Sequence, residues 1–141
     1  MIDVIGSDAG APASLPPMHQ HLVQNAELVA APKRLLPQLV GWLGSRADDQ
    51  QRLVSDDPIA LSDALAPLAP TLRIVVLASG DPLWFGIGRV LIERLGSERL
   101  RFHPAPSSMQ LAFARLGKPW QGAEWISLHG RDPSPLAQLL Q

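Results

Sequence analysis

Short apolar runs alternate along the chain with segments in which apolar residues recur every three or four positions. The runs predict β-strands at residues 2–5, 28–31, 52–54, 72–78, 100–103 and 125–128. The helical spacing predicts helices that begin near Pro16, Leu36, Asp57, Ile87, Ser107 and Leu136. Strands and helices in alternation favour an α/β fold with a mainly parallel sheet flanked by helices.

The apolar run at residues 72–78 is nearly uninterrupted, which is typical of a parallel strand that is covered on both faces. We therefore expect it at the centre of the sheet. Gly80-Asp81-Pro82 follow this run. Glycine permits backbone conformations that other residues resist, and proline fixes φ, so Asp81 is held rigidly at the edge of the sheet where ligands bind. The same tripeptide also fits an ordinary strand-to-helix turn in which Asp81 caps a helix.

Several helices carry a start signal or an apolar face. Asp57-Pro58 combines an N-cap residue with proline at the first helical position. Ser107 and Gln110 have the spacing of a capping box. Three helices each place four apolar residues on one face, which such spacing predicts to be the buried face. These residues are Met18, Leu22, Val23 and Ala26; Leu36, Leu39, Val40 and Leu43; and Met109, Ala112, Phe113 and Leu116.

Composition and charge narrow the classes of function. The 141 residues are 46% hydrophobic, which is enough to bury a core. A formal net charge of -1 argues against a broad nucleic-acid interface, which would need an excess of lysine and arginine. The absence of cysteine excludes disulfides, thiolate metal sites and cysteine nucleophiles. Four histidines without ligand spacing predict no metal site.

The chain shows no sign of targeting to a membrane. No apolar stretch approaches the roughly 20 residues that span a bilayer. The amino terminus lacks the basic and apolar regions of a signal peptide. Together with the lack of cysteine, these features favour a cytoplasmic protein without membrane or nucleic-acid partners.

Three motifs occur in a fixed order from the central strand onward. They read ASGDPLWFGIG, PAPSSMQLAFARLG and ISLHGR. In this order they resemble the tetrapyrrole methylase family, and within it the domain that methylates ring carbon C5 of precorrin-6Y in cobalamin (vitamin B12) biosynthesis. The resemblance is strong over residues 75–131, weaker over residues 2–36, and slight over residues 44–70.

The resemblance implies methyl transfer from S-adenosylmethionine to a ring carbon of a precorrin-type tetrapyrrole, without a metal or a covalent enzyme intermediate. Such a transfer is an in-line displacement, so the protein mainly aligns the reactants and excludes water. By the same resemblance, the residues that bind the methyl donor are Gly80, Asp81, Trp84, Ser107 and Ser108. Ser107 is equally well explained as a helix cap alone.

The resemblance also suggests four substrate-binding residues, which are Gly6, Lys33, His129 and Arg131. A precorrin carries many carboxylates, and an arginine can bind a carboxylate through two hydrogen bonds. Structural roles compete with this interpretation. His129 fits packing at the sheet edge, and Arg131 fits a surface contact. Lys33 and Arg34 fit the solvated start of a helix.

Two positions depart from the family pattern. Relatives usually have Gly-x-Gly after the first strand, whereas this chain has Gly6-Ser7-Asp8. Asp8 adds bulk and negative charge to a loop that approaches the ligand in the family. Relatives also tend to carry a Gly-Gly pair where this chain has Ala30-Ala31.

Members of the family fold as two α/β lobes with the methyl donor in the cleft between them. Residues 1–141 match only the N-terminal lobe, so we interpret them as one domain without the adenosine-binding half of the cleft. Three interpretations follow: a fragment of a methyltransferase, a lobe that binds or assembles without catalysis, or a small flavodoxin-like domain in which Asp81 holds another ligand or accepts a phosphoryl group. The resemblance further suggests a homodimer and a companion domain that methylates C15 and decarboxylates a side chain.

Overall fold

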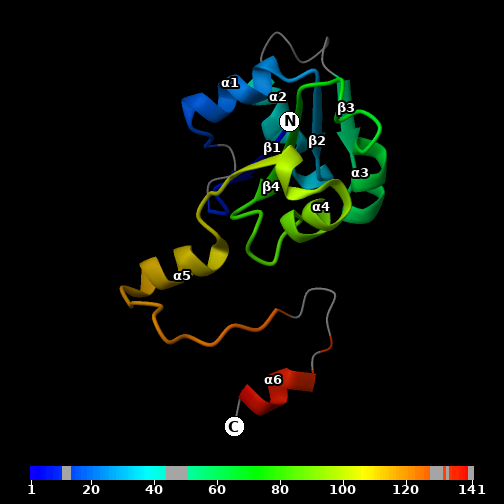
Figure 1. Ribbon diagram of the computed structural model, residues 1–141. Helices are drawn as coiled ribbons and strands as arrows, with labels where there is room; N and C mark the ends of the chain where they lie inside the picture. The colour runs from blue at the N-terminus through cyan, green and yellow to red at the C-terminus, as the bar shows by residue number, and fades with distance from the viewer. Residues whose placement is uncertain (11–13, 44–50, 128–131, 133, 140–141) are drawn as a thin grey trace.

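The body of the protein is a parallel sheet with helices on both faces, as the ribbon of the computed structural model shows (Figure 1). The structure describes residues 1–10, 14–43, 51–127, 132 and 134–139. Five strands form the sheet in the order β3-β2-β4-β1-β5, and every neighbouring pair is parallel. They are β1 (Ile2–Ser7), β2 (Leu28–Ala31), β3 (Gln51–Val54), β4 (Ile74–Ser79) and β5 (Leu100–His103). The predicted α/β class with a parallel sheet is confirmed.

This strand order excludes the flavodoxin-like interpretation. That fold has the order 2-1-3-4-5, in which the first strand lies beside the second and the third. Here β1 lies between β4 and β5, and β2 pairs with β3 and β4. The central position of β4 agrees with the prediction that the longest apolar run is covered on both faces.

Two pairs of helices cover the two faces of the sheet. Val23 of α1 (Pro17–Asn25) and Leu39 of α2 (Leu36–Leu43) are buried against one face. Leu61 of α3 (Pro58–Leu65) and Leu91 of α4 (Gly88–Leu95) are buried against the other. Each such side chain contributes roughly 1.5–3 kcal/mol to stability when it is fully buried. The resulting three layers hold the carboxyl ends of the strands in fixed positions.

Short connections complete the layers. Two 3₁₀ turns, η1 (Lys33–Leu35) and η3 (Ser97–Arg99), lie before α2 and β5. The predicted cap of α3 is present, because the Asp57 carboxylate accepts hydrogen bonds from the backbone N–H groups of Ile59 and Ala60 at 2.8 and 3.2 Å. Gly96, with φ of 84°, is the C-cap of α4.

The buried faces of α1 and α2 differ in part from the prediction. Met18 and Val40 are exposed, with 72% and 51% of their surfaces accessible. In α2 the buried positions are Leu39, Trp42 and Leu43, so the buried face is rotated toward Trp42 and leaves Val40 at its outer border.

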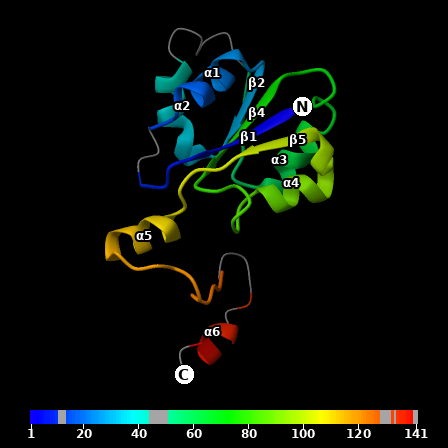
Figure 2. The same ribbon diagram turned by 60° about the vertical axis from the view of Figure 1, so that its left-hand side comes forward.

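The C-terminal part of the described chain lies outside the three layers. In both orientations α5 (Ser108–Leu116), the segment after it and α6 (Ser134–Leu139) extend away from the sheet beyond the carboxyl ends of the strands (Figures 1 and 2). No residue of α5 is buried, although the apolar spacing of its residues predicts a packed face. Leu116 exposes 66% of its surface. Among the described residues, the apolar face of α5 is therefore covered only in part, where the ring of Phe113 meets that of Trp125.

The predicted strand at residues 125–128 does not form over its described part. Residues 125–127 adopt no regular structure, and Leu128 lies outside the described residues. A strand needs a neighbour to accept and donate its backbone hydrogen bonds, and residues 125–127 pair with no described strand. Nor does the described part of the chain contain a helix long and apolar enough to cross a membrane.

Candidate functional site

Three segments meet at the carboxyl edge of the sheet because two glycines let their backbones approach. The N–H of Gly80 donates to the carbonyl oxygen of Ser7 at 2.6 Å, which extends the pairing of β1 with β4 by one bond. A Cβ at Gly6 would overlap the carbonyl oxygen of Gly80. The structure thus places Gly6 in close backbone packing, so its missing side chain is explained without the substrate contact that the sequence suggests.

Gly80 brings the turn after β4 against the start of α5. Its φ is +64°, a conformation that side chains other than glycine resist. A Cβ at this position would lie 3.1 Å from the Cα of Ser107. Two of the three segments that carry the family motifs are therefore in contact.

The carboxylate of Asp81 is oriented by its own turn. Its Oδ1 accepts a hydrogen bond from the N–H of Leu83 at 2.8 Å, and its carbonyl accepts one from the N–H of Trp84 at 3.1 Å. Helix α4 begins only at Gly88, and Ile87 is its N-cap, so Asp81 does not cap that helix. Among the described residues, no hydrogen bond reaches the Oδ2 atom of Asp81. One carboxylate oxygen is therefore available to a ligand.

A pocket of about 360 Å³ opens between this turn and the N-terminus of α5. All five residues predicted to bind the methyl donor line it, namely Gly80, Asp81, Trp84, Ser107 and Ser108. Phe85 and Trp125 also line it and were not predicted as site residues. Asp81 is the only charged residue among the described lining residues, whereas Asp8 of the first loop does not line the pocket.

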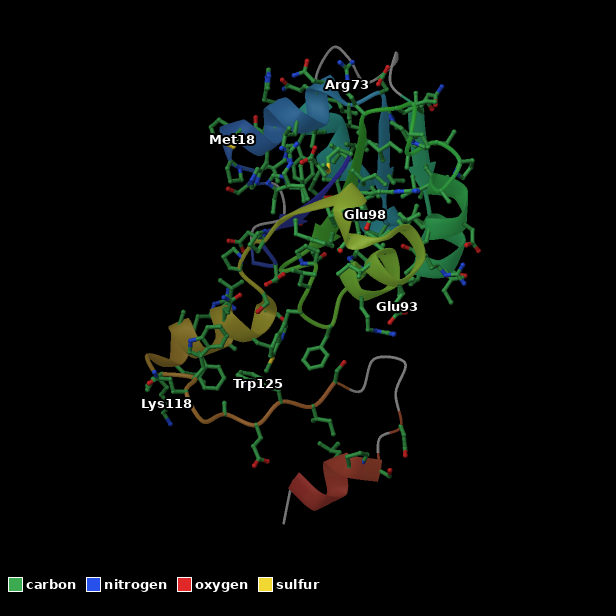
Figure 3. All side chains as sticks on the ribbon, in the orientation of Figure 1. Met18, Arg73, Glu93, Glu98, Lys118 and Trp125 are labelled. Atoms are coloured by element: carbon green, nitrogen blue, oxygen red, sulfur yellow. The ribbon has the colours of Figure 1, made fainter. Side chains whose placement is uncertain are left out.

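Trp84, Phe85 and Trp125 form an aromatic side of the pocket, and Trp125 also meets two rings that do not line it. Its ring lies 5.6 Å from that of Trp84 and 5.6 Å from that of Phe113, measured between centroids. Trp120 is 6.2 Å away. Figure 3 shows Trp125 reaching from the segment after α5 toward this cluster. The sequence offers little signal for this contact, because a tryptophan in an apolar run is equally typical of a core strand.

The N-terminus of α5 is capped as the sequence predicts. The N–H of Ser107 donates to Oε1 of Gln110 at 2.8 Å, and the N–H of Gln110 donates to Oγ of Ser107 at 3.3 Å. The N–H groups of Ser108 and Met109 have no hydrogen-bond partner among the described residues. Both residues line the pocket, so the positive end of the helix dipole faces a ligand there.

Lys33 and Arg34, the two basic residues after β2, make different hydrogen bonds. The backbone N–H of Lys33 donates to Oδ1 of Asp56 at 3.0 Å. Nε of Arg34 donates to Oγ of Ser79 at 3.2 Å, and Ser79 lines the pocket. The structure thus connects Arg34, not the predicted Lys33, to the pocket. His129 and Arg131, the other predicted substrate contacts, lie outside the described residues.

A separate polar cluster, here called the Asp3 cluster, joins β1, β5 and α1 away from the pocket. Buried Asp3 accepts hydrogen bonds from Nε and Nη2 of Arg101 at 2.6 and 3.1 Å, and its Oδ1 lies 2.7 Å from Nε2 of His103. The ring of His19 packs edge-on against that of His103 at 4.9 Å.

Burial and pairing act in opposite directions on the charge of Asp3. Burial alone would raise the pKa of Asp3, but the hydrogen bonds and charges of Arg101 and His103 outweigh it and lower that pKa. Burial, with a smaller effect from His103, lowers the pKa of His19, although the charge of Asp3 opposes this shift. The Asp3 cluster thus joins β1 to β5 through the contacts of Asp3 with Arg101 and His103.

The family of the protein is decided by a comparison that covers all 141 residues. The family model for tetrapyrrole (corrin/porphyrin) methylases matches residues 1–141. The chain belongs to this family. The resemblance that the three motifs carry is therefore confirmed.

Two curated proteins similar to this chain are named as methyltransferases of precorrins. The chain is 32% identical to the cobalt-precorrin-7 C(5)-methyltransferase of Salmonella typhimurium over 131 residues, which are 93% of this chain and 62% of that protein. It is 53% identical over 58 residues to the precorrin-6Y C(5,15)-methyltransferase [decarboxylating] of a Sinorhizobium species, covering 41% of this chain and 14% of that protein. The chain thus spans less than two thirds of the length of either relative.

Solved structures show the same fold at low sequence identity. The methyltransferase CobJ matches with a TM-score of 0.76 and 19% identity, over 99% of this chain and 61% of that one. Uroporphyrin-III C-methyl transferase from Thermus thermophilus, crystallised with S-adenyl homocysteine, matches with a TM-score of 0.62 and 18% identity, over 79% of this chain and 47% of that one.

Proposed function

We propose that this chain forms one wall of the S-adenosylmethionine site of a methyltransferase that acts on ring carbon C5 of a precorrin in cobalamin biosynthesis. The pocket carries the proposal, because it unites five motif residues at the carboxyl edge of a parallel sheet. The family assignment and the names of the Salmonella and Sinorhizobium relatives support the substrate class. The S-adenyl homocysteine in the Thermus structure supports the methyl donor.

The residues of the pocket suit binding and alignment. When bound, S-adenosylmethionine supplies a methyl group on a sulfonium sulfur, which an in-line displacement passes to a nucleophilic carbon. Asp81 offers a fixed carboxylate oxygen to the positively charged parts of the donor. The N–H groups at the start of α5 are suited to bind its carboxylate. The rigid turn fixes the donor, and the aromatic side of the pocket excludes water.

We further propose that residues 1–141 are the N-terminal lobe of a two-lobed methylase domain. The Salmonella relative is longer, since the chain spans 62% of it. The exposed apolar face of α5 suits a further layer of protein. A homodimer, and a companion domain with the C15 activity named for the Sinorhizobium relative, are proposals of the same kind.

Calorimetric titration of this 141-residue chain with S-adenosylmethionine tests the proposed site. One wall of a cleft should bind weakly, with a dissociation constant on the order of 1 mM. Asp81→Asn should weaken binding by about tenfold, because a charge-assisted contact is worth about 1.5–3 kcal/mol. Asp57→Asn makes the same chemical change at the cap of α3 and should leave binding unchanged. Equal affinity of Asp81→Asn and the unmodified chain would remove Asp81 from the site.

A further inference from the structure

We propose that Trp84, Phe85 and Trp125, together with Asp81, form a cation-selective corner that distinguishes the sulfonium methyl donor from its neutral thioether product. This inference rests on the proposed function, because it takes the ligand of the pocket to be S-adenosylmethionine. It adds a role that neither the motifs nor the relatives assign, and it gives Trp125 a part in the site.

The charge of the pocket favours a cation. Among its described lining residues Asp81 is the only one with a charge, and that charge is negative. Its Oδ1 is engaged by the N–H of Leu83, which fixes the direction in which Oδ2 points. Arg34 reaches the pocket wall only through Ser79 and is not itself a lining residue. Among the described residues, a positive ligand atom in the pocket would therefore meet a carboxylate and no competing basic side chain.

The aromatic rings have the arrangement that attracts cations. The rings of Trp84 and Trp125 are inclined at 88° to each other with centroids 5.6 Å apart, so they form two perpendicular walls. The ring of Phe85 lies 4.8 Å from that of Trp84 at 71°. Aromatic walls of this kind bind methylated cations through the negative faces of their rings, and tryptophan is the strongest of these residues.

The backbone next to the aromatic rings has an unfavourable conformation. Phe85 has a φ of +50°, which is unusual for a bulky residue and unfavourable by roughly 1–3 kcal/mol. Trp84 and Phe85 keep 37% and 43% of their surfaces exposed instead of burying them in the core. Binding of a ligand to these rings would explain both the strained backbone of Phe85 and the exposure of Trp84 and Phe85.

The distinction between donor and product follows from their charges. In methyl transfer the nucleophilic ring carbon supplies the electron pair of the new carbon–carbon bond, and the carbon–sulfur pair returns to sulfur as an uncharged thioether. The positive charge passes to the substrate, which loses it by releasing a proton. The attraction to Asp81 and to the rings then falls, so the product leaves more readily than the donor. We expect S-adenosylmethionine to bind about tenfold more tightly than S-adenosylhomocysteine, with about half of that free-energy difference due to the rings.

The test is an NMR titration of the 141-residue chain with each ligand, followed at the backbone amides of Gly80 and Ser108. Trp125→Leu should reduce the preference for S-adenosylmethionine from about tenfold to about fivefold, because one of the two ring walls is lost while Trp84 and Asp81 remain. Affinity for S-adenosylhomocysteine should change little. Trp125 lies outside the three layers, so its replacement leaves the core intact, and the spectrum of Trp42 in the core checks this.

Two matched variants complete the experiment. Trp125→Phe keeps a ring and should keep most of the preference, whereas Trp120→Leu removes an exposed tryptophan that does not line this pocket and should leave the ratio unchanged. Equal binding of the two ligands by the unmodified chain, or an unchanged ratio in Trp125→Leu, would overturn the cation-selective corner and leave the proposed function standing. Failure of both ligands to shift either amide would overturn both proposals.

Discussion

At the scale of single residues, the motif glycines serve the geometry of the strand ends. Gly6 and Gly80 lie where two neighbouring strands and the start of α5 come into backbone contact. The family motif identifies such positions without saying what the glycine avoids. In this chain Gly6 avoids the Gly80 carbonyl, and Gly80 avoids Ser107. Substitutions at these glycines should therefore act through stability first.

Gly6→Ala should destabilise the protein. The new Cβ would overlap the carbonyl oxygen of Gly80 and lie 3.0 Å from the backbone N of Ala105, and neither backbone can yield without disturbing the sheet. Overpacking of this kind costs about 1–3 kcal/mol or more. Urea unfolding followed by circular dichroism measures the loss. Gly41→Ala in α2 is the matched control, because a Cβ there meets no atom within 4 Å. Equal midpoints for the two variants would contradict the prediction.

Arg34 is the basic residue that we expect to bind a substrate carboxylate. Its Nε donates to Oγ of Ser79 at the pocket wall, and this bond leaves the Nη groups of the guanidinium to meet a carboxylate. Arg34→Gln should weaken binding of a polycarboxylate porphyrin by about tenfold, the loss expected for one charge-assisted hydrogen bond. The shift of the porphyrin absorption band on titration gives the affinity.

Lys33→Gln removes the neighbouring charge and is the control for Arg34→Gln. It should change porphyrin affinity less, because Lys33 is tied by its backbone to Asp56 and not to the pocket. The methyl ester of the same porphyrin should bind both variants equally. A greater loss in Lys33→Gln than in Arg34→Gln would return the substrate contact to Lys33.

At the scale of elements, the sequence predicts the helices that have a local start signal and the strands that are buried on both faces. β2 and β5 have the predicted bounds of residues 28–31 and 100–103, since short apolar runs between turns are sufficient for buried strands. Residues 125–127 fail as a strand although their pattern is similar, because a strand also needs a neighbour. The partner of a strand is a property of the whole sheet, and no local pattern contains it.

The N-cap residues of α3 and α5, Asp57 and Ser107, should differ in their effect on the stability of the protein. Ser107→Ala should speed amide hydrogen exchange within α5 by about fivefold, since losing an N-cap costs about 1 kcal/mol. Global unfolding should change little, because α5 buries no residue. Asp57→Ala should lower the global free energy of unfolding, because α3 packs Leu61 and Leu65 into the core. A global loss in Ser107→Ala would show that α5 is coupled to the sheet.

At the scale of the whole molecule, some site residues can be predicted from sequence motifs, whereas others reach the site only through the arrangement of the chain. The five predicted donor-binding residues meet in one pocket because β4 and the start of α5 are brought together by the sheet order. Trp125 and Arg34 enter the site through contacts between segments distant in sequence. Arg34 and Ser79 are 45 residues apart, and their hydrogen bond depends on β2 lying beside β4. No spacing rule predicts such a contact.

The Asp3 cluster makes the stability of the whole sheet depend on pH. The folded-state pKa of Asp3 is lowered from 3.8, so the folded protein keeps this carboxylate charged where the unfolded chain begins to bind a proton. Its stabilising effect is complete well above pH 3.8 and is lost as pH falls through the lower folded value. The pKa of His19 is lowered from 6.5, so protonation of the unfolded chain begins to destabilise the fold already as pH falls through 6.5.

Acidification should therefore weaken the fold in two stages, and Asp3→Asn should remove the lower one. Urea unfolding between pH 8 and pH 3 measures both, because the slope of the unfolding free energy against pH gives the difference in bound protons between the two states. Asp3→Asn should also be less stable at neutral pH, since Arg101 and His103 lose a buried charged partner joining β1 to β5. Asp63→Asn breaks an exposed pair with Arg94 and should leave the pH profile nearly unchanged. An Asp3→Asn profile that runs parallel to that of the unmodified protein below pH 5 would show that the lowered pKa of Asp3 does not couple the two strands.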